Sequence, residues 1–362
     1  MKGILLLEDG SCFEGTSIGV PGERFGPVVL NTAVVGYQEM LTDSTNAGKI
    51  LILTYPLIGN YGIAEKFYES RRCWTEALVI HEESRIHSNW QAESGLDAFL
   101  TRENLVTLSQ VDTRTLAVQI RDRGEMLGLV STETTDTANL LKKLVKYRES
   151  HKNSYIPAAS VAKITEHHRS KSGPSIAVID LGVSNSFVNQ LKTLGCSITL
   201  LPFNTDAKTI LDLKPDGVVI SNGPEEDEAI PAIAATVREI LGKKPLLGIS
   251  TGHEVLCLAL GAKLKKMKIG HHGVNYPVKP PSEYGGTITV QNHSLVVDEK
   301  SLPDNKDIQI TLRNVDDDSI EEIESAPLKF ISAQYYPAHP GFDETHALFG
   351  RFLDLVKKEK GM

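Results

Sequence analysis

Residues 245–252 read Pro-Leu-Leu-Gly-Ile-Ser-Thr-Gly, and this stretch decides the fold of the second half of the chain. Its apolar start predicts a buried strand, and the pattern Gly-x-Ser-x-Gly predicts a tight turn that leads into a helix. Such an elbow is strained and its backbone passes close to itself, so small residues are needed on either side. The turn lifts Ser250 above the end of the sheet, which makes Ser250 a candidate nucleophile.

The sequence around this elbow alternates between strand and helix patterns. Strands are predicted at 176–181, 197–201, 217–220 and 245–249, and helices at 186–194 and 229–241. This alternation predicts an α/β domain with a mostly parallel open sheet covered by helices. Chemistry in such sheets lies beyond the carboxyl ends of the strands, where Gly182, the loop 221–224 and Ser250 fall. From about residue 270 the pattern changes to shorter strands, for example at 286–290 and 295–297.

The first half of the chain is richer in strands. A hairpin is predicted from 4–7 and 12–13, and further strands at 28–30 and 50–53. The loop 54–62 carries two tyrosines among Gly, Pro and Asn; a binding loop is one reading, but we favour a tightly packed connection. Polar stretches at 148–154 and 167–174 predict a linker over 151–174 with a short ordered piece around 156–164, and therefore domains at 1–150 and 175–362.

Composition limits the function classes. The chain has 362 residues, 41% hydrophobic and 23% charged, with a net charge of −8 and no basic cluster, so we expect no nucleic-acid partner. No apolar run approaches the roughly 20 residues of a membrane span, and the first residues do not read as a signal peptide, so we expect no membrane association. Four cysteines without C-x-x-C spacing suit a reducing cytoplasm and argue against structural zinc: Cys12, Cys73, Cys196 and Cys257.

Over its whole length the chain resembles the small subunit of carbamoyl-phosphate synthetase. The matching segments lie in the family order at 31–32, 36–39, 41–43, 54–62, 88–90, 112–114, 221–224, 248–249, 252–253, 270–273, 291–293 and 339–341. The resemblance implies a strand-rich α/β N-terminal domain and a class I glutamine amidotransferase domain with a Cys-His-Glu triad. It also implies a partner, the large synthetase subunit, which receives ammonia from glutamine and binds ATP and a metal ion; no cofactor is expected in this chain.

The catalytic positions depart from the family pattern. The family motif G-I-C-L-G-H-Q reads G-I-S-T-G-H-E here, so Ser250 stands at the nucleophile position. Tyr336 stands where the family has the triad histidine, and the same stretch is one residue short, which removes the triad glutamate. The family's S-N-G-P-G-D-P loop is Ser-Asn-Gly-Pro-Glu-Glu-Asp here, with Glu225 at the second glycine. The substrate-binding positions implied by the resemblance, several of them changed, are Thr45, Gly223, Glu225, Thr251, Glu254, Asn292, Ser294 and Leu295.

These changes predict an inactive glutaminase site. A cysteine at a helix N-terminus beside histidine ionises near pH 7, whereas a serine hydroxyl needs a general base during attack. Tyr336 is a poor base because an ordinary tyrosine has a pKa of about 10. Losses of this kind cost on the order of 10⁶-fold in rate. A carboxylate at Glu225 would repel a developing oxyanion, where loss of one donor alone costs about 10²–10³-fold.

Other readings of the sequence remain. Gly-x-Ser-x-Gly is also the elbow of serine hydrolases, and His293, His339 and His346 lie downstream, so an active serine hydrolase or amidase with a relocated histidine is the alternative. We favour a scaffold that binds the large subunit and catalyses nothing, in arginine or pyrimidine synthesis. His271 and His272 look like a metal pair, but strand neighbours point to opposite faces, so no metal site is expected. The acidic residues of 316–322 are expected to form a solvated loop and strand edge.

Overall fold

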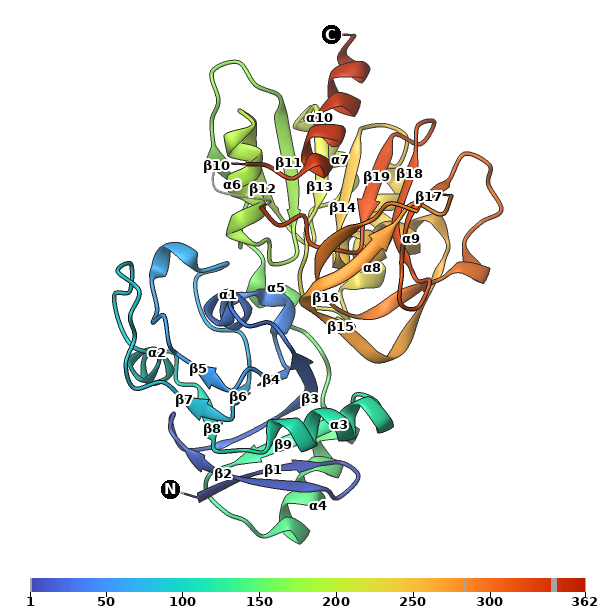
Figure 1. The fold of residues 1–362 in the computed structure, drawn as a ribbon. Helices are drawn as coiled ribbons and strands as arrows, with labels where there is room; N and C mark the ends of the chain where they lie inside the picture. Colours follow the sequence, from blue (N-terminus) through green and yellow to red (C-terminus); the bar gives the residue numbers. More distant parts are fainter. Residues whose placement is uncertain (1, 283, 340–343, 362) are drawn as a thin grey trace. The chain divides into compact units, whose positions relative to one another are not determined.

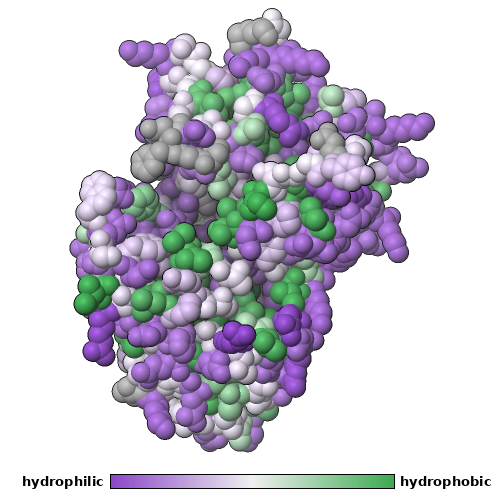
Figure 2. Space-filling model, viewed as in Figure 1, coloured by the Kyte–Doolittle hydropathy of each residue, from purple (hydrophilic) through white to green (hydrophobic). Residues whose placement is uncertain are grey.

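The computed structural model describes residues 2–282, 284–339 and 344–361. The chain forms two compact units, Met1–Asn153 with Lys268–His272, and Ser154–Met267 with Gly273–Met362. Figure 1 shows the order of the elements, and the α/β class with a strand-rich first unit is confirmed. On the face drawn in Figure 2, hydrophobic residues form small separate groups among hydrophilic ones. Across the described residues, no helix has the length and apolar character that a membrane crossing requires.

The first unit is built on a closed seven-stranded barrel. The strands follow the order β1-β2-β8-β6-β4-β3-β9 around the barrel, with β1 and β2 as the predicted hairpin. Alternate strand residues fill the interior, where the side chains of Leu5, Val28, Ile52 and Leu108 are fully buried. The barrel strands are β1 (Lys2–Leu7), β2 (Cys12–Ser17), β3 (Glu23–Asn31), β4 (Ile50–Leu53), β6 (Ala77–Val79), β8 (Val106–Ser109) and β9 (Leu127–Ser131).

Short helices and loops surround this barrel. Asp112 and Asp136 cap α3 and α4 by accepting hydrogen bonds from backbone N–H groups of the first turn. The remaining elements of the unit are α1 (Tyr37–Thr42), η1 (Ser44–Asn46), β5 (Leu57–Ile58), η2 (Glu65–Phe67), β7 (Glu82–Glu83), α2 (Leu96–Arg102), α3 (Thr113–Arg123) and α4 (Thr137–Ser150).

The loop 54–62 is a packed connection in this structure. The Tyr61 hydroxyl accepts hydrogen bonds from the backbone N–H groups of Gly36 and Tyr37, at 2.7 and 2.9 Å. The Tyr37 hydroxyl donates to the carbonyl oxygen of Gly62, and the two tyrosine rings stack at 4.2 Å. Through these contacts Tyr61 fixes the start of α1.

The second unit is built on a ten-stranded mixed sheet. Five strands, β12-β11-β13-β14-β19, form its parallel centre, and β10, β18 and β17 add antiparallel pairs. Its strands are β10 (Thr165–His168), β11 (Ser175–Asp180), β12 (Ser197–Pro202), β13 (Gly217–Ile220), β14 (Leu246–Ile249), β15 (Lys263–Lys279), β16 (Thr287–Asp298), β17 (Gln309–Asn314), β18 (Ile320–Ser325) and β19 (Phe330–Ala333).

Helices cover both faces of this sheet (Figure 1). One core joins alternate strand residues such as Ile179 to α7, α8 and α9, and the other joins residues such as Val178 to α6 and α10. This arrangement is why the parallel strands read as continuous apolar runs. The helices of the unit are α5 (Ile156–Ala159), α6 (Asn185–Thr193), α7 (Ala207–Asp212), α8 (Ile230–Ile240), α9 (Thr251–Leu260) and α10 (Ala347–Lys360), with η3 (Glu299–Ser301).

Two sequence expectations differ from this fold. In the stretch expected as a linker, 151–174, α5 lies within the ordered piece expected around 156–164, but β10 was not expected and pairs antiparallel with β12 at the edge of the sheet. Shorter strands were expected from about residue 270, and β17, β18 and β19 are short, but β15 spans 17 residues and β16, where separate strands were expected at 286–290 and 295–297, spans 12. The polar sequence of β10 hid this strand, because edge strands do not need apolar side chains. In β16 the polar stretch 291–294 separated the two expected strands, yet it is buried in the structure.

Candidate functional site

The nucleophile elbow forms between β14 and α9. Ser250 lies between them with φ 54° and ψ −114°, a left-handed backbone that non-glycine residues rarely adopt. A Cβ on Gly248 would lie 2.7 Å from the carbonyl oxygen of Gly252, and a Cβ on Gly252 would lie 2.1 Å from that of Ile220. The two glycines therefore permit the strained turn that the sequence pattern predicts.

The Ser250 hydroxyl has no base in this structure. The Ser250 backbone is fixed, because its N–H donates to the carbonyl of Ala333 at 2.8 Å and its carbonyl accepts from His253 and Glu254. Its Oγ atom is buried and has no hydrogen-bond partner among the described residues. A serine becomes a nucleophile only when an adjacent base removes its proton, so the elbow presents an unactivated hydroxyl.

Tyr336, where the resemblance implies the triad histidine, is used for packing. Its ring meets that of Phe187 edge to face, with centroids 5.3 Å apart and an interplanar angle of 81°. Its backbone N–H donates to the carbonyl of Val290 at 2.8 Å. Because the Ser250 hydroxyl has no partner among the described residues, Tyr336 does not hydrogen bond to it.

The downstream histidines are engaged elsewhere. The two ring nitrogens of His293 contact the carbonyl of Leu295 at 2.8 Å and Gln291 Oε1 at 2.7 Å. His339 is exposed and contacts the carbonyl of Glu344, while His346 Nδ1 accepts from Leu348 N–H at the start of α10. None of the three supplies Ser250 with the base that a serine hydrolase requires.

His253, three residues after Ser250, is also no base for it. Its Nδ1 lies 2.9 Å from Ser332 Oγ, and its Nε2 lies 3.7 Å from Cys257 Sγ. The ring is fully buried, and this burial lowers the pKa of His253 to about 4. His253 is therefore neutral near pH 7, and it holds α9 against β19 as a core side chain.

The loop after β13 is held by polar contacts to the segment after β11 and to the elbow. Ser221 Oγ accepts from Leu181 N–H at 3.0 Å, and Asn222 Oδ1 accepts from Ser184 N–H at 3.0 Å. A Cβ on Gly223 would lie 2.3 Å from the Leu181 carbonyl, so only glycine fits. Thr251 Oγ1 donates a 2.6 Å hydrogen bond to the carbonyl of Gly223.

Glu225 binds backbone N–H groups of β16. Its carboxylate accepts from Ser294 N–H, with both oxygens within 3.0 Å, and from Leu295 N–H at 3.4 Å. We expected this carboxylate to repel a developing oxyanion; its backbone partners, 69 and 70 residues away, were not predicted. The structure thus joins three of the implied substrate-binding residues directly to one another.

The remaining implied substrate-binding residues are also buried. Glu254 Oε1 accepts from Gln334 Nε2 at 3.1 Å, and Asn292 lies on β16 with 8% of its surface exposed. Thr45 belongs to the first unit, where it lies in η1 and its N–H donates to Asp43 Oδ1 at 3.0 Å.

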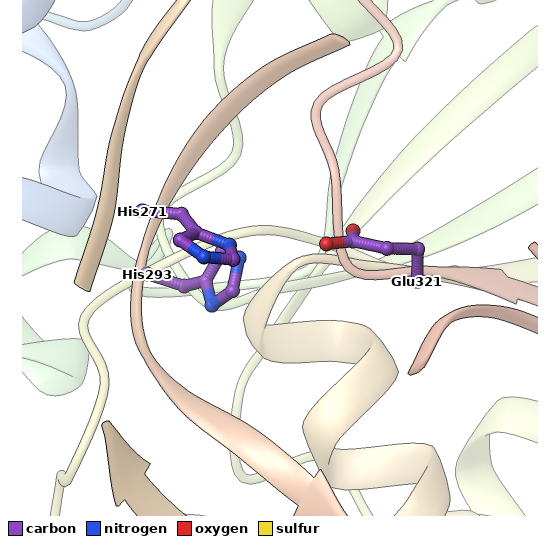
Figure 3. A group of neighbouring side chains, drawn as sticks. All are labelled: His271, His293 and Glu321. Carbon is purple, nitrogen blue, oxygen red and sulfur yellow. The ribbon is translucent and has the colours of Figure 1, made fainter. Parts of the chain in front are cut away.

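A group of metal-ligating types occurs in the chain, although no metal site was expected. His271, His293 and Glu321, all buried, offer ligand atoms within 4.8 Å of one another (Figure 3). The expectation considered His271 only with its neighbour His272, whereas Glu321 is 50 residues away in the sequence. Both ring nitrogens of His293 already have hydrogen-bond partners, and Asn314 Nδ2 donates to Glu321 Oε1 at 3.0 Å. We assign no metal to this group.

The acidic stretch is only partly solvated, which corrects the expectation for it. The residues of 316–318 are exposed, but Glu321 and Glu322 on β18 are fully buried. Glu322 accepts hydrogen bonds from Thr311 Oγ1, Tyr335 OH and Arg351 Nη1, each at 2.6–2.7 Å. Buried carboxylates are stable when paired and hydrogen-bonded in this way.

Two family models match the chain. The carbamoyl-phosphate synthase small chain CPSase domain matches residues 5–130, and the class-I glutamine amidotransferase matches residues 177–355. The carbamoyl phosphate synthase small chain of Chlorobaculum tepidum is 37% identical over 99% of this chain and 98% of its own length. The chain belongs to the carbamoyl-phosphate synthase small chain family.

Other members are similar over nearly all of this chain. The pyrimidine-specific small chain of Bacillus subtilis is 35% identical over 99% of this chain and 96% of its own length. The chloroplastic small chain of Oryza sativa is 36% identical over 98% of this chain and 82% of its own length. As a small chain of a two-subunit synthase, a member of this family has a large-subunit partner.

Proposed function

We propose that this small chain has lost glutamine hydrolysis and supports a large subunit that takes its nitrogen from free ammonia. The observation that carries the proposal is the buried Ser250 hydroxyl, which has no hydrogen-bond partner among the described residues. The packed Tyr336 ring and the missing triad glutamate support the same conclusion. In this account the second unit is a pseudo-amidotransferase whose fold is retained for binding.

The proposal assigns the ligase chemistry to the partner. ATP and a metal ion belong to the large subunit, and this chain holds no cofactor. Relatives named pyrimidine-specific support a role in pyrimidine synthesis, and arginine synthesis is the other pathway proposed. The site of action proposed is the cytoplasm, without nucleic-acid or membrane partners.

We place the contact with the large subunit on the loop around Trp90 in the first unit. Trp90 is 89% exposed and Ile86 is 80% exposed, although large apolar side chains are normally buried. Lys66 Nζ lies 5.7 Å from the centre of the Trp90 ring. Exposed tryptophans are enriched among residues that dominate protein interfaces, so Trp90 is the anchor that we propose.

A serine hydrolase or amidase remains the competing function. Nothing in the described site favours it, because the Ser250 hydroxyl makes no hydrogen bond to a histidine among the described residues. The test is glutamate release from glutamine by the full chain, alone and with its large subunit, for wild type and Ser250→Ala. We expect both forms to release glutamate at the same background rate. A rate typical of amidotransferases, abolished by Ser250→Ala, would overturn the proposal.

A further inference from the structure

Two consecutive backbone N–H groups of β16 converge on one carboxylate. Ser294 N lies 2.9 and 3.0 Å from the Glu225 oxygens, and Leu295 N lies 3.4 Å from Oε1. Successive N–H groups along an extended strand point in opposite directions, so their convergence marks a local bend. Successive N–H groups that converge in this way form a concave site for an anion.

The carboxylate of Glu225 and the two N–H groups that bind it are buried. Glu225, Ser294 and Leu295 are exposed by only 7%, 6% and 8%, so the carboxylate and its donors lie away from bulk water. Hydrogen bonds to an ionised acceptor are stronger than neutral ones. A buried N–H group that loses its acceptor is costly, so these N–H groups require an occupant.

The occupant comes from the loop after β13, which is hydrogen-bonded to the elbow. Glu225 follows the segment 221–224, whose Gly223 carbonyl accepts the hydrogen bond of Thr251, the neighbour of Ser250. A glycine at position 225, as in the family motif, has no side chain to offer these N–H groups. A free carboxylate could then bind them.

We propose that Glu225 is a built-in ligand that fills a carboxylate-binding site formed by the N–H groups of Ser294 and Leu295. The inference rests on the proposed function only in treating the second unit as a disused glutamine site. It adds that glutamine is excluded by occupation of its site. If Glu225 excluded glutamine only by charge repulsion, the neutral variant Glu225→Gln would bind glutamine.

The neighbouring residue provides a matched control. Glu226 is exposed, and its carboxylate lies 3.2 Å from Lys266 Nζ. Glu226→Gln therefore removes one negative charge from the same loop, while the N–H groups of Ser294 and Leu295 keep Glu225 as their acceptor. Glu225→Ala empties them, and Glu225→Gln keeps a side-chain carbonyl that can accept from them.

The experiment observes the Leu295 N–H group directly in the full chain. The sequence has two Ser-Leu pairs, 294–295 and 301–302, so carbonyl-labelled serine with nitrogen-labelled leucine gives amide signals only for Leu295 and Leu302. Leu302 N–H donates to the carbonyl of Glu299, away from the site, and is the internal reference. Acetate is the probe for the N–H pair, and L-glutamine with its carboxyl-amide derivative is the probe for the amino-acid ligand.

In Glu225→Ala, acetate should shift the Leu295 signal saturably, with a Kd on the order of 10 mM. Wild type, Glu225→Gln and Glu226→Gln should respond at least about tenfold more weakly. L-Glutamine should shift the Leu295 signal as acetate does, and its carboxyl-amide derivative should not.

Thermal melting shows whether each variant is folded, and Glu225→Gly replaces Glu225→Ala if the alanine variant is unfolded. Equal responses in wild type and Glu225→Ala, no response in a folded Glu225→Ala, or a Glu225→Gln that binds like Glu225→Ala would each overturn the proposal. These readouts require no large subunit and no catalysis, so their failure is distinct from failure of the proposed function.

Discussion

The ring of Tyr336 packs edge to face on Phe187, with the ring centroids 5.3 Å apart. Aromatic pairs of this geometry stabilise a fold beyond the area that they bury. Tyr336→Ala should therefore lower the free energy of unfolding by about 2 kcal/mol, since the ring is only partly buried. Tyr336→Phe keeps the ring and should lose less than about 1 kcal/mol. Urea unfolding of the two variants checks this, and an alanine variant as stable as wild type would show that the ring does not hold the core.

Restoring the family's nucleophile and base should not restore glutaminase activity. Ser250→Cys combined with Tyr336→His still lacks the triad glutamate, and Glu225 still occupies the N–H groups of β16. We expect glutamate release to rise by less than about tenfold over wild type, because triad residues act as a unit. The matched control is Ser250→Cys alone. A double variant that approaches the rate of an active amidotransferase would show that the site has lost only two side chains.

The elbow could be predicted from sequence because its requirements are local. Gly248, Ser250 and Gly252 lie within five residues, and the close approaches at both glycines explain why the pattern is needed. The role of Glu225 could not be predicted, because its partner Ser294 is 69 residues away. The pattern of charges along the sequence does not indicate which distant residues will pair.

The buried acids show the same limit. Glu322 was expected at a solvated strand edge. In the structure its buried carboxylate accepts hydrogen bonds from Thr311, Tyr335 and Arg351. Burial of a charge depends on partners that only the fold brings together. The strand and helix alternation of the second unit was predictable for the opposite reason, because its apolar runs are determined by burial within each element.

The stability of the chain should fall as the pH falls from 6.5 towards 4. Burial lowers the pKa of His253 to about 4, whereas an unfolded histidine has a pKa of about 6.5. In this window the unfolded chain binds a proton that the folded chain does not, so stability is fully present above pH 6.5 and is lost as the pH drops. This residue should cost about 2 kcal/mol between pH 7.5 and 5.

Urea titrations at several pH values measure this effect. His253→Gln should reduce the pH dependence of the free energy of unfolding by about that amount. A wild-type pH profile that His253→Gln does not alter would mean that folding does not lower the pKa of His253.

Trp90→Ala should weaken assembly with the large subunit without affecting the fold. An anchor tryptophan typically contributes 2 kcal/mol or more to binding, so we expect a loss of about 30-fold or more in affinity. Because Trp90 is 89% exposed, the melting temperature should stay within about 1 °C of wild type. Val118→Ala changes another exposed apolar residue, on α3, and serves as the control. Equal affinity for wild type and Trp90→Ala would place the interface elsewhere.

The most direct test of the account is the nitrogen donor of the assembled synthetase. The chain is co-expressed with its large subunit, the complex is purified, and carbamoyl phosphate formation is measured with ammonium or with glutamine. The account predicts that the two chains co-purify and that ammonium supports synthesis while glutamine gives background. Failure of the chains to co-purify, or synthesis with glutamine at a rate comparable to that with ammonium, would contradict it.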